Sequence, residues 1–127
     1  MTTDPERETV LVVDGANVVG ARPDGWWRDR AGAEARLHGR LATASLPVDR
    51  VVLVLEGAAR PGVPQGIVGV LETVHAPGSG DDEVVAQVVR AAAENRRVTV
   101  VTADRGLRTR VAAHGAHVVG PGWLDAH

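Results

Sequence analysis

The stretch TVLVVDGANVVG, residues 9–20, decides the fold. Its first half is an unbroken apolar run rich in β-branched residues, which predicts a strand buried on both faces. The run ends in Asp14, and Asn17 follows three residues later. Asp, Gly and Asn are ordinary turn residues, so Asp14 either only ends the strand or also holds a ligand. The rest of the sequence bears on this choice.

Composition bounds the fold and excludes several kinds of chemistry. With 127 residues, 44% of them hydrophobic and 24% charged, the chain is expected to form one globular domain. It has no Cys, which excludes disulfides, a thiolate nucleophile and Cys-ligated zinc. All 14 basic residues are Arg, which excludes a P-loop lysine and a Schiff base. Any metal must therefore bind to oxygen or imidazole.

Charge and hydropathy bear on the cellular location of the protein and on its contact with nucleic acid or membrane. A net charge of −2 is not that of a domain that binds nucleic acid over a broad surface, so such contact would need a local Arg patch. No apolar stretch approaches the roughly 20 residues that cross a bilayer, and the acidic start MTTDPERE is unlike a signal peptide. We expect a cytoplasmic protein without membrane contact. Residues 1–8 are expected to be a flexible leader, and residues 9–127 a single domain.

Apolar runs and segments of helical period alternate along the chain. Further strands are expected at residues 50–56, 66–74, 97–103 and 116–120, and helices at residues 29–45, 81–95 and 105–114. This alternation predicts a parallel sheet covered on both faces. The fold class is therefore α/β, with three Rossmann-like layers around a central, mainly parallel sheet of about five strands. In such sheets, ligands bind beyond the carboxyl ends of the strands.

Acidic residues gather at these predicted carboxyl ends. Asp14, Glu56 and Asp104 each follow a strand, and Asp81 and Asp82 begin a helix. Each alone is explained as a turn residue or a helix cap. Together, clustered carboxylates raise one another's pKa and cost stability unless a cation neutralises them. Oxygen ligands suit Mg²⁺ or Mn²⁺, so the sequence predicts a site for one of these ions.

Three segments of the chain carry its acidic residues in a fixed order: VVDGANVVG (residues 12–20), GSGDDEVVAQVV (residues 78–89) and VVTADRGLRTRV (residues 100–111). These segments resemble the PIN-like nucleases, and within them the bacterial YacP-like branch of the NYN domain. Their order and spacing carry the resemblance, which covers roughly residues 10–119. It implies a Rossmann-like parallel sheet, a divalent-metal site of clustered acids, and RNA endonuclease activity.

The resemblance also implies roles for residues of the first and third segments. Asp14 would be the metal ligand that follows the first strand, with Asn17 as its polar partner. Asp104 would be the acid of the third segment, and Thr102 would supply a hydroxyl to the substrate.

The middle of the chain leaves two choices open. Asp82 is preferred to Asp81 as the mid-chain acid, because Val85 then falls where the family has an apolar residue. Relatives often end the second strand in Asp, whereas this chain has Glu56. The longer side chain can still reach a metal ion or its water, so Glu56 and Asp81 are supporting candidates for the metal site.

Candidate substrate contacts lie in two further segments. Trp26 and Trp27 stand beside Arg28 in the loop after the first strand, and aromatic residues beside Arg suit stacking of single-stranded bases. One Trp is expected to close the core, and we take Trp27 with Arg28 as the pair that touches substrate. Arg105 and Arg108 flank the loop that carries Asp104 and could clamp a phosphate.

The leading hypothesis is a divalent-metal-dependent ribonuclease that cuts single-stranded RNA endonucleolytically by phosphodiester hydrolysis. Its expected partner is RNA, with messenger RNA on the ribosome as one form, and either a monomer or a homodimer is open. Two alternatives remain. One is a catalytically weak or inactive PIN-like module that binds RNA, the ribosome or a protein. The other is a hydrolase of small phosphate esters or nucleotides.

Overall fold

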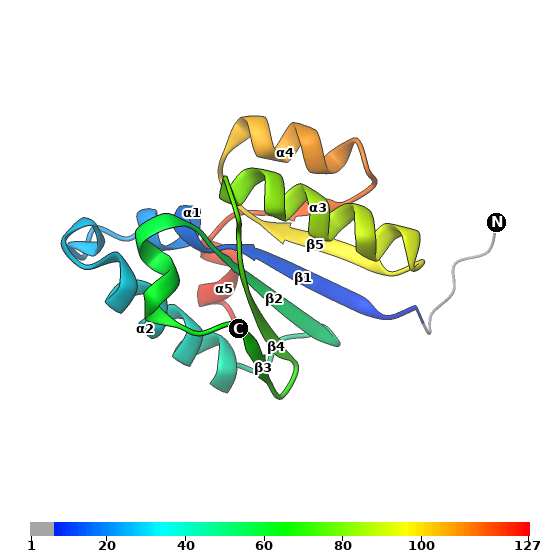
Figure 1. Cartoon of the computed structure of the whole chain (residues 1–127). Helices are drawn as coiled ribbons and strands as arrows, with labels where there is room; N and C mark the ends of the chain where they lie inside the picture. Colours follow the sequence, from blue (N-terminus) through cyan, green and yellow to red (C-terminus); the bar gives the residue numbers. More distant parts are fainter. Residues whose placement is uncertain (1–6) are drawn as a thin grey trace.

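A six-stranded sheet forms the centre of the molecule in the computed structural model, which describes residues 7–127 (Figure 1). The strand order is β3-β4-β2-β1-β5-β6, and every neighbouring pair is parallel except β3 and β4. The strands are β1 (Thr9–Asp14), β2 (Arg50–Leu55), β3 (Gly66–Val68), β4 (Leu71–His75), β5 (Arg97–Val101) and β6 (His117–Val119). A mainly parallel sheet, as the sequence predicts, is confirmed.

Helices cover both faces of this sheet (Figure 1). On one face α1 (Gly15–Gly20), α2 (Arg30–Thr43) and α5 (Gly122–Asp125) pack on Leu11 and Val13 of β1. On the other, α3 (Gly80–Ala93) and α4 (Arg105–Ala112) pack on Val10 and Val12. Successive β1 side chains point to opposite faces, so each joins a different core. The three-layer α/β architecture is therefore confirmed.

The chain reverses its direction of travel across the sheet at β1. The neighbours of β1 are β2 on one side and β5 on the other. In open parallel sheets, such a switch point leaves a crevice at the carboxyl ends of the strands. Asp14, the last residue of β1, therefore lies at the place where this fold accepts a ligand.

Two local features differ from the predicted elements. Residues 66–74, predicted as one strand, form the antiparallel pair of β3 and β4, because Gly69 turns the chain with a φ of 61°. The sheet consequently has six strands rather than about five. The segment after Asp14, predicted as a turn, is the short helix α1, and two further 3₁₀ turns, η1 (Trp26–Arg28) and η2 (Gly57–Gly62), follow α1 and β2.

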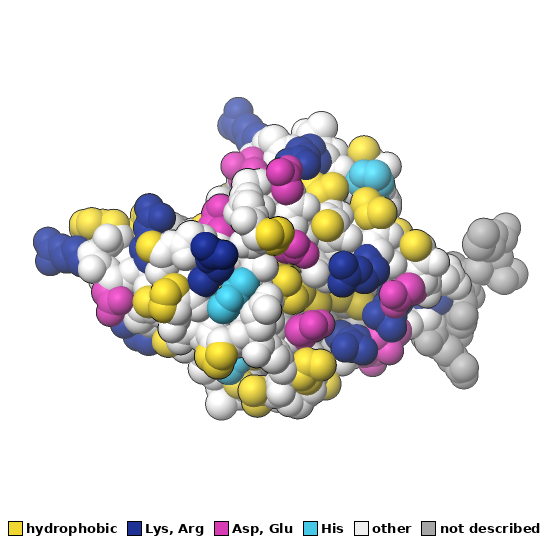
Figure 2. All heavy atoms as spheres, in the orientation of Figure 1, with side chains coloured by type: hydrophobic (Ala, Val, Ile, Leu, Met, Phe, Trp, Pro, Cys, Tyr) yellow, Lys and Arg dark blue, Asp and Glu magenta, His cyan; other side chains and the backbone are white. Residues whose placement is uncertain are grey.

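The first described residues are held against the domain by hydrogen bonds. Residues 1–6 of the predicted leader lie outside the described residues, whereas Arg7 donates from Nε to the Asn95 carbonyl at 2.9 Å. The Arg97 backbone N–H donates to the Glu8 carbonyl at 2.9 Å, which ties residue 8 to the start of β5. Within residues 7–127, no helix is both long and apolar enough to cross a membrane. Figure 2 shows Arg and acidic side chains interspersed on one face.

Candidate acidic site at the carboxyl edge of the sheet

Asp14 is a buried carboxylate between β1 and α1. Its side chain is 5% exposed, and its Oδ2 accepts a hydrogen bond from Thr102 Oγ1 at 3.0 Å. Burial raises the pKa of Asp14 to about 6, the Thr102 hydroxyl opposes part of this rise, and the charges of Asp81 and Glu56 add to it. Other acids therefore lie close enough to Asp14, at this edge of the sheet, for their charges to affect its pKa, as the sequence predicts.

Hydrogen bonds pin the loop after β5 to Asp14 and α1. Thr102 Oγ1, besides donating to Asp14, accepts from the Asp104 backbone N–H at 3.2 Å. Asn17 Oδ1 accepts from the Ala103 backbone N–H at 2.7 Å. Thr102 is fully buried, so it cannot contact a substrate as predicted and instead positions Asp14. Asn17 likewise ties the two segments together.

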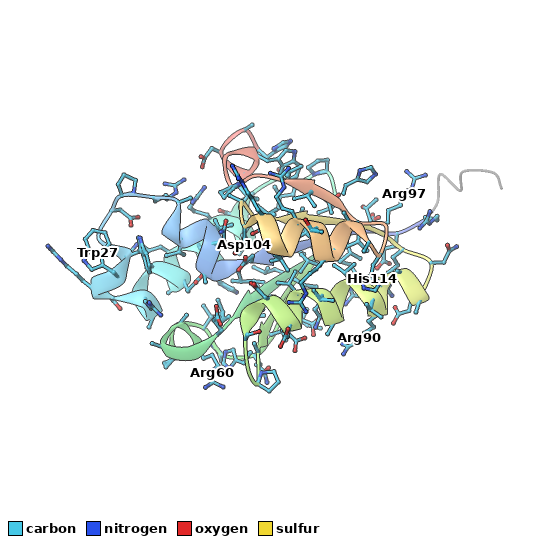
Figure 3. The ribbon with its side chains drawn as sticks, turned by 90° about the horizontal axis from the view of Figure 1, so that it is seen from above. Trp27, Arg60, Arg90, Arg97, Asp104 and His114 are labelled. Atoms are coloured by element: carbon cyan, nitrogen blue, oxygen red, sulfur yellow. The ribbon has the colours of Figure 1, made fainter. Side chains whose placement is uncertain are left out.

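Asp104 lies at the start of α4 and is exposed. Its Oδ1 accepts from the Leu107 backbone N–H at 2.8 Å, which makes it the N-cap of the helix. Capping uses one carboxylate oxygen and fixes the side chain at the sheet edge. Figure 3 shows Asp104 near the middle of the molecule, away from Arg97 and His114 at the opposite edge.

The structure turns Asp81, and not Asp82, toward the other acids. Burial raises the pKa of Asp81, and the charges of Asp104 and Glu56 add to the rise. The Asp82 side chain is 73% exposed and accepts from Arg110 Nη2 at 2.9 Å, which lowers the pKa of that carboxyl. The sequence prefers Asp82 as the mid-chain acid, whereas in the structure the charges of Glu56 and Asp104 act on Asp81.

The way in which α3 packs on the sheet explains the difference between Asp81 and Asp82. Ser79 caps the helix by accepting from the Asp82 backbone N–H at 3.1 Å, and Val84 is fully buried, whereas Val85 is only partly covered. Asp81 is three residues before Val84 and shares its side of the helix. Asp82 is the next residue along the helix, so its side chain lies about 100° further around the axis and is exposed to solvent.

Glu56 joins the end of β2 to the start of α3. Its Oε2 accepts from the Gly80 backbone N–H at 2.8 Å, and a Cβ at Gly80 would lie 3.0 Å from Oε1. An acid is favoured at a helix N-terminus by the helix dipole. The structure thus brings Glu56 to the same edge as Asp14, with one of its oxygens engaged by the helix.

Glu34 is a further acid at this edge, which our sequence analysis missed. It lies on α2, is 2% exposed, and its Oε1 has no hydrogen-bond partner. Burial raises the pKa of Glu34 to about 8, and the charges of Asp14 and Glu56 add to the rise. The sequence does carry a signal, because Glu34 precedes Leu37 and Leu41 by three and seven residues on the apolar stripe of the helix.

These acids form what we call the acidic cluster: Asp14, Glu34, Glu56, Asp81 and Asp104. The five members come from five separate chain segments, and the charges of other members raise the pKa of Asp14, Glu34 and Asp81. None of the ion pairs within residues 7–127 involves a member of the cluster. No member of the cluster is therefore neutralised by an ion pair in this part of the chain, although the charge of Arg110 partly opposes the raised pKa of Asp81.

The donor set of the cluster fits a hard divalent cation. In the described part of the chain, no three Asp, Glu or His side chains lie close enough to hold a metal ion as they stand. Mg²⁺ keeps several waters and commonly takes only one or two carboxylates, so it does not require such a cage. A cation beside Asp14 would oppose the rise in its pKa, which burial and the charges of Asp81 and Glu56 cause.

The predicted substrate contacts occupy two places around the cluster. Trp26 packs against the core, as expected of one of the two tryptophans, while Trp27 is 57% exposed. The Arg28 guanidinium lies 5.8 Å from the centroid of the Trp27 ring. Arg105 and Arg108 are exposed on the first turns of α4, beside Asp104. Figure 3 shows Trp27 projecting from the end of the molecule that lies farthest from Arg97.

The strand order and the helices on both faces make a three-layer, Rossmann-like α/β fold, consistent with that of PIN-like proteins. Its solved counterparts include Rae1 (YacP) from Bacillus subtilis, with a TM-score of 0.70 and 19% identity over 92% of this chain and 71% of that one. A tryptophan-to-leucine mutant of the same protein gives a TM-score of 0.69 and 18% identity over 92% and 72% of the two chains. No protein-family model matches the sequence, and no curated protein matches it either. The likeness agrees in fold with the resemblance to the YacP-like branch.

Proposed function

We propose that this protein is a divalent-metal-dependent endoribonuclease that hydrolyses phosphodiester bonds in single-stranded RNA of the cytoplasm. The observation that carries the proposal is the acidic cluster, in which buried Asp14 lies among like charges with no basic partner. Carboxylates in such an arrangement are stabilised by a cation. The fold shared with Rae1 (YacP) and the resemblance of the three motifs to NYN nucleases support the same function.

In this proposal each residue of the site has a distinct task. Asp14, Asp81 and Asp104 hold Mg²⁺ or Mn²⁺, directly or through its waters, and Glu56 and Glu34 add negative charge beside them. When bound, the ion supplies an activated water and neutralises charge at the scissile phosphate.

The surrounding residues orient the acids and the RNA. Thr102 keeps Asp14 in place through its hydroxyl, and Asn17 keeps the loop before Asp104 against α1. Arg105 and Arg108 are placed to contact phosphate oxygens. Trp27 and Arg28 offer a stacking surface to unpaired bases, which favours single-stranded RNA over small phosphate esters.

One observation favours a second candidate function, a PIN-like module that binds RNA, the ribosome or a protein without cutting. As they stand, the described residues include no group of three potential metal ligands. Titration with Mn²⁺ by calorimetry separates the two functions. Metal binding at micromolar to low millimolar concentration supports the nuclease, and no heat at millimolar Mn²⁺ supports the module.

The direct test is RNA cleavage by purified protein. With Mn²⁺ or Mg²⁺, the wild type is expected to cut an internally labelled single-stranded RNA, and EDTA should stop it. Asp14→Asn keeps an acceptor for Thr102 but removes a metal ligand, so cleavage should fall at least about 100-fold. Asp125→Asn, an exposed acid on α5, is the matched control and should cut normally. Wild-type rates from Asp14→Asn would contradict the proposed site.

A further inference from the structure

A cavity of about 180 Å³ adjoins the acidic cluster, and Glu34 and Glu56 of the cluster are in its lining. It is enclosed by α1, η1, the start of α2 and η2. The residues that line it include Ala16, Val19, Trp26, Arg30, Glu34 and Ala59. At about 30 Å³ per water, its volume is that of roughly six water molecules.

The walls of this cavity are apolar and aromatic. Val19 and Ala59 are 7% and 4% exposed, and Trp26 is partly buried against the core. The Arg30 guanidinium lies 5.5 Å from the centroid of the Trp26 ring, which leaves a cation beside an aromatic surface. Such walls suit a flat ring system rather than an extended polar ligand.

The inner end of the cavity is polar and negative. Glu34 lines it and is 2% exposed, and its Oε1 packs against Gly15, where an added Cβ would lie 2.9 Å away. Glu56, a second carboxylate of the lining, belongs to the acidic cluster. An N–H donor of a ligand in the cavity can bond to a carboxylate oxygen that faces the cavity. A neutral ligand suits this end of the cavity, because burial raises the pKa of Glu34 to about 8 and a charged group beside it is disfavoured.

We propose that this cavity binds one base of the RNA, from a nucleotide next to the scissile phosphate. A nucleobase is neutral and flat, and its edge carries N–H donors for Glu34, whereas its face can stack on Trp26. Since the cavity adjoins the acidic cluster, a base seated there places its own phosphate near Asp14. This assignment rests on the proposed nuclease function. It gives Trp26 and Arg30 a role distinct from that of Trp27 and Arg28.

Binding can be tested without cleavage and without metal. The chain has three Trp, so the spectrum of ¹⁵N-labelled protein in EDTA should show three indole N–H signals, assigned by single Trp→Leu variants. The four ribonucleoside 5′-monophosphates are the probes, and ribose 5-phosphate is the control without a base. We expect the Trp26 signal to shift with at least one nucleotide and not with ribose 5-phosphate.

A matched pair of substitutions tests the location. Ala16 is exposed and lines the cavity, so Ala16→Leu should fill the cavity while the protein still folds. It should weaken nucleotide binding at least about fivefold, the lower range for loss of one stacked base. Ala86→Leu, at an exposed position of α3, should leave binding within twofold of wild type. Unchanged binding in Ala16→Leu, or equal shifts with ribose 5-phosphate, would overturn the assignment.

Cleavage measured separately distinguishes failure of this inference from failure of the nuclease. If the wild type binds nucleotides at Trp26 but cuts no RNA with Mn²⁺, the base site stands and the nuclease is rejected. If it cuts RNA while Ala16→Leu changes neither nucleotide binding nor the positions of cleavage, the nuclease stands and the base site is rejected.

Discussion

Two sets of acidic side chains in this molecule differ in burial and in partners. Asp82 and Asp125 are 73% and 58% exposed, and each is paired with arginine: Asp82 with Arg110, and Asp125 with Arg22 and Arg40. Asp14 and Glu34 are 5% and 2% exposed and have no arginine partner. The exposed carboxylates are thus paired with arginine, whereas the two buried carboxylates have no arginine partner.

The difference shows where the fold carries an electrostatic cost. Exposed ion pairs contribute about 0 to 1 kcal/mol each, so the arginine-paired acids have little effect on stability. For Glu34, burial and like charges raise the pKa from 4.5 to about 8. At about 1.36 kcal/mol per pKa unit, the charged form costs on the order of 5 kcal/mol. In the proposed function, a cation held by Asp14, Asp81 and Asp104 lowers this cost, because it lies beside the Glu34 carboxylate.

The largest expected effect comes from removing the Glu34 charge. Because folding raises the pKa of Glu34, the native state holds its proton more tightly, and stability falls as the pH rises from about 4.5 through about 8. The substitution Glu34→Gln removes this pH-dependent loss of stability, because glutamine does not ionise. In EDTA, urea unfolding should show a variant more stable than wild type by several kcal/mol at pH 9 and nearly equal to it at pH 5.

The matched control for this substitution is Glu94→Gln. Glu94 is exposed and paired with Arg96, so its difference from wild type should stay within about 1 kcal/mol at both pH values. If Glu34→Gln behaves like this control, Glu34 is not a buried unpaired acid.

The second effect concerns the cation. A metal that binds only the native state stabilises it by about 2.7 kcal/mol at 100 times its Kd. Since Asp14 has its pKa raised to about 6, protons compete with the metal below that pH. Mn²⁺ should therefore raise the Tm at pH 7.5 more than at pH 5, and should do little for Asp14→Asn. An equal rise in wild type and Asp14→Asn would place the metal elsewhere.

The smallest effect separates the neighbours Asp81 and Asp82. Asp82→Asn breaks the exposed pair with Arg110 and should change stability by less than about 1 kcal/mol and cleavage by less than twofold. Asp81→Asn, which alters a residue inside the cluster, should reduce cleavage at least about tenfold. If Asp82→Asn reduces RNA cleavage more than Asp81→Asn does, then Asp82 and not Asp81 is the metal ligand.

The sequence predicts the sheet well because buried parallel strands are continuous apolar runs that end in polar residues. It predicts the acidic edge for the same reason, since the ends of parallel strands meet. It does not separate Asp81 from Asp82, because the choice depends on a rotation of about 100° set by Ser79 and Val84.

Two features were missed for different physical reasons. The β3–β4 hairpin depends on a positive φ at Gly69, which an apolar run conceals. Glu34 was missed because acids on helices are usually exposed, although its position on the stripe with Leu37 and Leu41 marks it as buried.

The hydrogen bond from Thr102 to Asp14 also bears on the order of events during synthesis and folding. The two residues are 88 positions apart in the chain, and β1 cannot complete its pairing until β5 has formed on its other side. Contacts this distant in sequence form late, since the intervening chain must first be ordered. A nascent chain that ends before β5 therefore presents Asp14 on a strand that lacks one of its two neighbours. The acidic cluster is assembled only when nearly the whole domain has been made.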